Sequence, residues 1–158
     1  MSALFFDQRP GLSPITRNRR TILMDELPRR IRSDAVATSP SPRRWIVETI
    51  DGGSVLVALP GTRAPDLIFS PAANGLYHIY VGLYSYDGQP SEVGVRVGDL
   101  GPFKHLHLED GEIDSREVLF GRVDVTGRDV VLRHPVEKRS CVSHVRLTPL
   151  RKQSGFST

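Results

Sequence analysis

From Trp45 onward, the sequence is a series of short apolar runs separated by Gly, Pro, Asn and Asp. Such runs, spaced about 8–12 residues apart, are typical of β-sandwiches and barrels. They predict nine strands: Trp45–Ile50, Ser54–Leu59, Asp66–Phe69, Leu76–Tyr84, Glu92–Val97, Lys104–Leu108, Glu117–Val123, Asp129–Arg133 and Val142–Thr148. No segment in this part supports a three-turn helix, so βαβ architectures are not expected. We therefore predict an all-β fold of two packed antiparallel sheets, a β-sandwich.

The longest run, Leu76–Tyr84, shows which side chains should face the core. Alternate residues of a strand point to opposite faces. One face carries Tyr77, Ile79, Val81 and Leu83, and the other carries His78, Tyr80, Gly82 and Tyr84. We expect this run to be a central strand. Between the first two runs, the glycines of Asp51-Gly52-Gly53 tolerate the positive φ of a tight hairpin turn.

The first 44 residues differ in composition from the rest of the chain. They contain nine arginines and only four acidic residues, whereas the whole chain has a net charge of +3. We predict an Arg/Pro-rich N-terminal arm at 1–44, the β-sandwich domain at 45–150 and a C-terminal tail at 151–158. The arginines are not interleaved with the aromatic side chains that stack on bases, and the remaining domain is slightly acidic. Both observations argue against nucleic acid as the partner.

Several classes of protein do not fit this chain. No apolar run approaches the roughly 18 residues of a membrane span. The first residues lack the basic and long apolar regions of a secretory signal, and the sequence leaves the compartment unknown. The single cysteine, Cys141, precedes a strand-like run, where a lone thiol behaves as a small hydrophobe.

A histidine pair supplies the first candidate site. His105 and His107 are two residues apart in a predicted strand, so they project to the same side, and Glu112 follows after four residues. This spacing resembles the first half of the cupin metal motif. The resemblance implies a divalent metal held by His105, His107 and Glu112 in a metal-dependent enzyme; no other cofactor is predicted. The alternative is a solvated strand face beside an acidic turn.

The connector after the longest run supplies the second candidate site. Tyr84, Tyr86, Asp87 and Gln89 combine aromatic rings with hydrogen-bonding groups, which suits the apolar face and the hydroxyls of a sugar. The sequence therefore predicts a ligand-binding loop formed by these four residues. The alternative is a β-turn whose tyrosines cap the core.

Four segments also resemble a known kind of domain: Gly75–Leu83, Val93–Val97, Val123–Leu132 and Val142–Leu150. They are similar to the strand series of bacterial jelly-roll domains of the galactose-binding or carbohydrate-binding-module kind. The resemblance implies a jelly-roll sandwich that serves as an accessory domain of a larger glycosidase-like protein. Its partner would be a carbohydrate or a neighbouring domain of a longer chain.

We therefore predict a non-catalytic module that binds a carbohydrate or glycoconjugate. Two alternatives stay open at this point. One is the metal-dependent cupin-like enzyme, and the other is a structural or protein-interaction β-sandwich.

Overall fold

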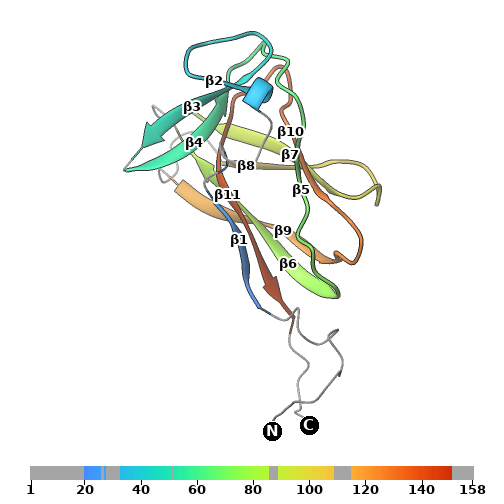
Figure 1. The fold of residues 1–158 in the computed structure, drawn as a ribbon. Helices are drawn as coiled ribbons and strands as arrows, with labels where there is room; N and C mark the ends of the chain where they lie inside the picture. Colours follow the sequence, from blue (N-terminus) through green and yellow to red (C-terminus); the bar gives the residue numbers. More distant parts are fainter. Residues whose placement is uncertain are drawn as a thin grey trace, which may run out of the picture.

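Two β-sheets pack against each other in the computed structural model, which describes residues 20–25, 27, 33–50, 52–85, 89–108 and 115–150 (Figure 1). The elements are β1 (Ile22–Met24), η2 (Ser33–Ala35), β2 (Val36–Ala37), β3 (Trp45–Ile50), β4 (Gly53–Ala58), β5 (Leu67–Phe69), β6 (Leu76–Tyr84), β7 (Ser91–Val97), β8 (Lys104–Leu108), β9 (Ser115–Asp124), β10 (Val130–Arg133) and β11 (Ser140–Pro149). All nine predicted strands are present, as β3 to β11, and the predicted all-β sandwich is confirmed. In the described part of the chain, no helix has the length and apolarity to cross a membrane.

The larger sheet has the order β2-β3-β4-β11-β6-β9, and β1 also pairs with β11. The smaller sheet has the order β5-β10-β7-β8. The pairing is antiparallel throughout except between β2 and β3, which are parallel. Two strands of the large sheet, β1 and β2, come from the segment predicted as an arm. The chain repeatedly crosses between the sheets, so segments far apart in sequence meet at the ends of the sandwich.

The core lies between the sheets, where the alternation of the strands predicted it. The inward side chains of β6, Tyr77, Ile79, Val81 and Leu83, are at most 1% exposed. They share the core with apolar side chains of the other strands, among them Val93, Val95, Val97, Val130, Leu132, Val142, Val145 and Leu147. Burying one such aliphatic side chain contributes about 1.5–3 kcal/mol, so this apolar interior holds the sheets together.

Trp45 begins β3 and is fully buried. Its indole Nε1–H donates a hydrogen bond of 2.8 Å to the carbonyl of Pro65, so burial leaves its polar group satisfied. The hairpin between β3 and β4 forms as predicted, with Gly52 at a φ of +81°. Only a glycine adopts this left-handed conformation without cost. Asp51 of the same predicted turn lies outside the described residues.

Candidate functional site

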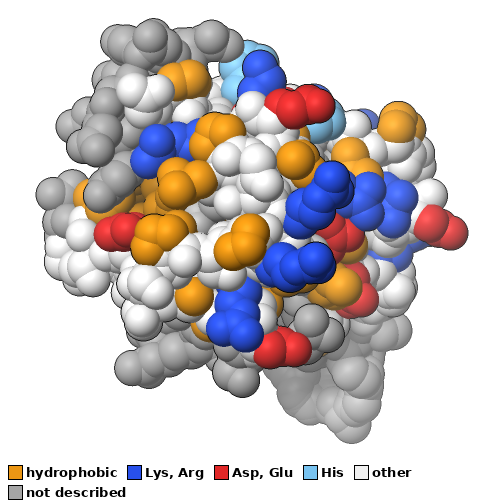
Figure 2. Space-filling model, turned by 90° about the horizontal axis from the view of Figure 1, so that it is seen from above, with side chains coloured by type: hydrophobic (Ala, Val, Ile, Leu, Met, Phe, Trp, Pro, Cys, Tyr) orange, Lys and Arg blue, Asp and Glu red, His pale blue; other side chains and the backbone are white. Residues whose placement is uncertain are grey.

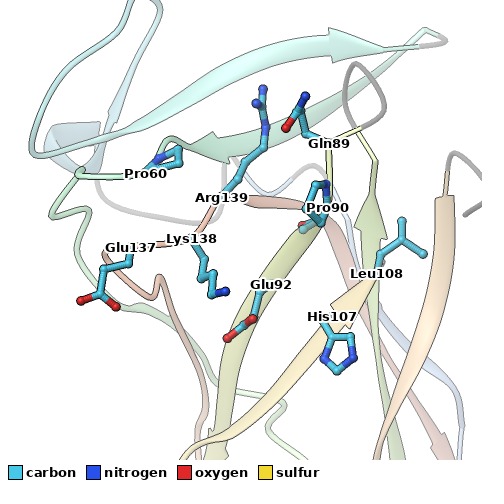
Figure 3. Close-up of a pocket in the computed structure, with 10 residues that line it drawn as sticks. Pro60, Gln89, Pro90, Glu92, His107, Leu108, Glu137, Lys138 and Arg139 are labelled. Atoms are coloured by element: carbon cyan, nitrogen blue, oxygen red, sulfur yellow. The ribbon is translucent and has the colours of Figure 1, made fainter. Parts of the chain in front are cut away.

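A pocket of about 400 Å³ lies where β7 begins and β8 ends (Figure 3). We call it the β7–β8 pocket. Its walls come from four separate chain segments: the β4–β5 loop, the start of β7, the end of β8 and the β10–β11 loop. Its lining residues are Pro60, Gln89, Pro90, Ser91, Glu92, His107, Leu108, Glu137, Lys138 and Arg139. The volume falls within the range of about 300–1,000 Å³ that is usual for small-molecule sites.

Hydrogen bonds between the two sheets fix the base of the pocket. The Ser140 hydroxyl of β11 donates to the carbonyl of Glu92 at 2.6 Å. The amide of Glu92 donates to the carbonyl of Arg139 at 2.8 Å, and the amide of Cys141 donates to the Ser91 hydroxyl at 2.9 Å. These bonds hold β7 of the small sheet against β11 of the large one. The backbone that positions the Glu92 side chain is therefore rigid.

Behind this base lies His134, which is only 4% exposed. Its Nδ1 lies 2.8 Å from the Ser140 oxygen. Because the Ser140 proton goes to Glu92, Nδ1–H must be the donor in this contact. Burial lowers the pKa of His134, although hydrogen bonds to the carbonyls of Leu59 and Thr62 oppose that shift.

The Glu92 carboxylate is held from the neighbouring strand. His105 Nδ1 lies 2.8 Å from Glu92 Oε2, and the His105 side chain is half exposed. His107 is directly opposite Glu92 in the β7–β8 register and is also exposed. The two predicted metal ligands on β8 thus share one face, as expected. Glu112 lies outside the described residues, within which no group of three potential metal ligands occurs. The three-residue metal site stays a prediction.

Of the four residues in the predicted ligand-binding loop, the structure describes Tyr84 and Gln89, and these two lie in different places. Gln89 lines the β7–β8 pocket together with His107, so one residue from each predicted site reaches the same cavity. Tyr84 instead packs against a small apolar cluster formed by Ile46, Val55, Val57 and Cys141. Tyr86 and Asp87 lie outside the described residues. The four-residue binding loop therefore stays a prediction.

The other lining side chains did not stand out in the sequence. Glu92 lies inside a predicted strand, and Pro60 lies in a loop without a motif. Glu137, Lys138 and Arg139 form a short charged run between two strands, which was the only local signal in that loop. No local pattern indicated that these segments meet, because their proximity depends on the strand order of the two sheets.

A second polar cluster lies on the outer face of the large sheet, and we call it the outer-face cluster. Its centre is Glu117 of β9, whose carboxylate accepts hydrogen bonds from Arg146 Nε at 2.8 Å and Arg146 Nη2 at 2.6 Å. His144 Nε2–H donates to the same carboxylate at 2.7 Å, and His144 Nδ1 lies within hydrogen-bond distance of the Ser143 hydroxyl, at 2.8 Å. The Arg146 guanidinium also lies 4.5 Å above the Tyr80 ring. Every member of this cluster is therefore engaged with another.

Two pKa values follow from these environments. The hydrogen bonds from Arg146 are the main cause that lowers the pKa of Glu117 to about 2, with His144 adding to the effect and burial opposing it. Burial raises the pKa of the Cys141 thiol to about 12. Since the thiolate is the nucleophilic form, Cys141 is chemically inert at neutral pH. It is the buried small hydrophobe that the sequence predicted.

Comparisons with known proteins show a structural similarity. No protein-family model matches the sequence, and no curated protein matches it. The fold is similar to that of a Podospora anserina GH26-CBM35 β-(1,4)-mannanase, with a TM-score of 0.51 and 12% sequence identity. The match covers 86% of this chain but only 29% of the mannanase chain, so the chain spans under a third of that protein's length. At this identity, the likeness shows that the β-sandwich architecture is shared with part of that mannanase.

Proposed function

We propose that this β-sandwich is a non-catalytic module that binds a carbohydrate or glycoconjugate in the β7–β8 pocket. The observation that carries the proposal is the convergence of hydrogen-bonding side chains from three chain segments around one cavity. Figure 3 shows Glu92, His107 and Lys138 entering this region from different strands and loops. A pocket with several polar groups and some apolar wall is the usual form of a small-ligand site.

The chemistry of the lining suits a sugar. Each sugar hydroxyl both donates and accepts hydrogen bonds, so its site needs both kinds of partner. The Gln89 amide offers both, the Glu92 carboxylate accepts, and the Lys138 ammonium donates. Pro60, Pro90 and Leu108 add apolar surface for the C–H face of a sugar ring.

The structural neighbour supports the same choice and suggests which sugars to test first. That neighbour is a β-(1,4)-mannanase by name, and its match to this chain lies in fold. Oligosaccharides of β-(1,4)-linked mannose are therefore the first candidates. Other uncharged oligosaccharides complete the panel, because the pocket lining does not single out one sugar.

Isothermal titration calorimetry against this panel tests the proposal. We expect at least one uncharged oligosaccharide to bind, and the variants Gln89→Ala and His107→Ala each to weaken its affinity about tenfold. A tenfold loss corresponds to about 1.4 kcal/mol, which is the size of one lost hydrogen bond. His78→Ala is the matched control, because His78 is on the large sheet and does not line the pocket.

Two results would contradict the proposal. One is the absence of binding by every sugar at millimolar concentrations. The other is unchanged affinity in both pocket variants. Repeating the titration in chelator, and again with added divalent cations, measures whether binding depends on a metal.

A further inference from the structure

Three loops meet at one end of the sandwich, opposite the end where β1 begins and β11 finishes (Figure 1). They are the β2–β3 loop (38–44), the β4–β5 loop (59–66) and the β10–β11 loop (134–139). The amide of Arg63 donates to the carbonyl of Pro42 at 2.7 Å, which joins the first loop to the second. The amide of Gly61 donates to the carbonyl of Val136 at 2.6 Å, which joins the second to the third.

These loops bring together four exposed cations: Arg43, Arg44, Arg63 and Lys138. We call this group the basic loop end. Within the described part of the chain, none of the four side chains has an ion pair or ring contact. Figure 2 shows this end of the molecule, where Lys and Arg side chains gather with acidic side chains among them. The four cations are therefore available to a partner.

The acidic residues of the three loops do not neutralise this charge. Asp66 is engaged by Arg133, whose Nε and Nη2 donate to its two oxygens at 3.0 and 2.8 Å. Glu137 is exposed beside Lys138 and is the other acid in these loops. The loops therefore carry an excess of positive charge.

The loops are also rigid. They contain five prolines, Pro40, Pro42, Pro60, Pro65 and Pro135, each of which fixes its own φ. Together with the hydrogen bonds between the loops, this rigidity keeps the cations in place before a ligand arrives. Binding then loses less conformational entropy than it would with flexible loops.

The basic loop end is continuous with the β7–β8 pocket. Lys138 belongs to both, and Pro60 of the pocket wall comes just before Gly61 in the β4–β5 loop. A polymer with one unit in the pocket can therefore extend over the cations. Arginine forks match the oxygens of sulfate and phosphate groups, and they bind them more strongly than neutral donors do. The three loops contain no Phe, Tyr or Trp on which bases could stack, which disfavours single-stranded nucleic acid.

We infer that the ligand is a carbohydrate polymer that carries sulfate or phosphate esters. One sugar unit occupies the β7–β8 pocket, and ester groups of neighbouring units lie on Arg43, Arg44, Arg63 and Lys138. The inference rests on the proposed function and adds the charge of the ligand to it.

Titrations with dextran sulfate, dextran phosphate and uncharged dextran of equal length test the inference at several salt concentrations. We expect an esterified dextran to bind at least tenfold more tightly than uncharged dextran, with an affinity that falls as salt rises. The triple variant Arg43→Gln, Arg44→Gln, Arg63→Gln should lose at least tenfold of that affinity. Its plot of log affinity against log salt should be shallower by about 2–3 units, roughly one per lost contact. Arg122→Gln, an exposed arginine on β9, is the matched control and should change neither value.

The comparison of the two dextran esters identifies which anion the cations prefer. The inference is overturned if neither ester binds better than uncharged dextran, if the triple variant binds like the wild type, or if a DNA duplex of equal charge binds more tightly. Each of these results leaves the proposed function standing as long as an uncharged oligosaccharide still binds through Gln89 and His107. Circular dichroism and thermal unfolding of the triple variant show whether a loss of affinity reflects a loss of fold.

Discussion

The β7–β8 pocket and the outer-face cluster contain similar side chains but differ in how those side chains are paired. Each has a glutamate that contacts a histidine, and each has a cationic side chain nearby. In the outer-face cluster, Glu117 is surrounded by Arg146 and His144, and Tyr80 lies under the guanidinium. In the pocket, Glu92 contacts His105, and the lining side chains surround a cavity.

This difference shows that residue types alone do not identify a binding site. The outer-face cluster has a tyrosine, a histidine and charged side chains, residue types that are common in ligand-binding sites. Its groups are already satisfied by one another, so a ligand would have to break those bonds to gain new ones. The pocket is a cavity that an incoming molecule can enter, which is why we propose the function there.

Gly82→Ala should give the largest loss of stability, because it disrupts the outer-face cluster. A Cβ at position 82 would overlap the His144 imidazole and the Ser143 hydroxyl. Overpacking of this kind costs about 1–3 kcal/mol. We expect urea unfolding to show a loss of about 2 kcal/mol, while calorimetry shows unchanged ligand affinity in the pocket.

Gly53→Ala is the matched control for this variant. The atom nearest to its added Cβ would be the carbonyl oxygen of Ile50 at 3.8 Å, an ordinary contact. Its stability should stay within about 0.5 kcal/mol of the wild type. Equal stabilities for the two alanine variants would show that His144 does not lie tightly over β6.

Ser140→Ala should weaken the β7–β8 pocket, because Ser140 helps to fix the base of that pocket. The change removes the hydrogen bond to the Glu92 carbonyl and leaves His134 Nδ1 without its acceptor. Leaving buried polar groups unsatisfied costs about 1–3 kcal/mol, and we expect a loss of about 1.5 kcal/mol in urea unfolding. Because β7 is then held less firmly against β11, affinity in the pocket should also fall.

The matched control for this change is Ser143→Ala, a serine of the outer-face cluster. It should cost less stability, since its partner His144 is partly exposed, and it should leave pocket affinity unchanged. If Ser143→Ala weakened ligand binding as much as Ser140→Ala, the two regions would not be independent.

Glu117→Gln should give the smallest effect at neutral pH, below about 1 kcal/mol, because the ion pair is partly exposed. Its larger effect should be on how stability changes at acidic pH. The folded-state pKa of Glu117 is about 2 and the ordinary value is 4.5, so the unfolded chain binds the proton more readily. The stabilisation is complete above pH 4.5 and is lost as the pH falls towards 2.

Unfolding curves measured from pH 6 to pH 2 therefore check this prediction. The wild type should lose the Glu117 contribution within that window, and Glu117→Gln should lack that part of the acid dependence. Glu48→Gln, on β3, removes an equal charge elsewhere, and this variant should keep the acid dependence that comes from Glu117. Parallel curves for the wild type and Glu117→Gln would show that the Arg146 and His144 bonds add no stability.

Much of the fold could be predicted from local pattern. The alternation in Leu76–Tyr84 identified the buried face of β6, and the glycines after Asp51 identified the β3–β4 turn. The short strand β2 lacked such a signal. Its two residues, Val36 and Ala37, form a strand because they lie beside Trp45 and Ile46 of β3.

The candidate site was predictable only in pieces. Gln89 and His107 were identified in two separate patterns, but no pattern joined them. The same holds for the basic loop end. The sequence assigned Arg43 and Arg44 to a basic arm, and it left Arg63 and Lys138 inside a slightly acidic domain. Net charge counted by sequence segment therefore could not reveal the basic loop end, which forms only when the three loops come together in the fold.

By itself the sequence determined nine of the strands, the inward face of β6 and the burial of Cys141, because these depend on the alternation of neighbouring residues and on hydrophobic burial. The tertiary structure decided which strands became neighbours, and with them the pocket and the basic loop end. Glu92 and Ser140, whose hydrogen bond fixes the base of the pocket, are 48 residues apart in the chain. Such contacts follow from how the two sheets order their strands, which local sequence patterns do not encode.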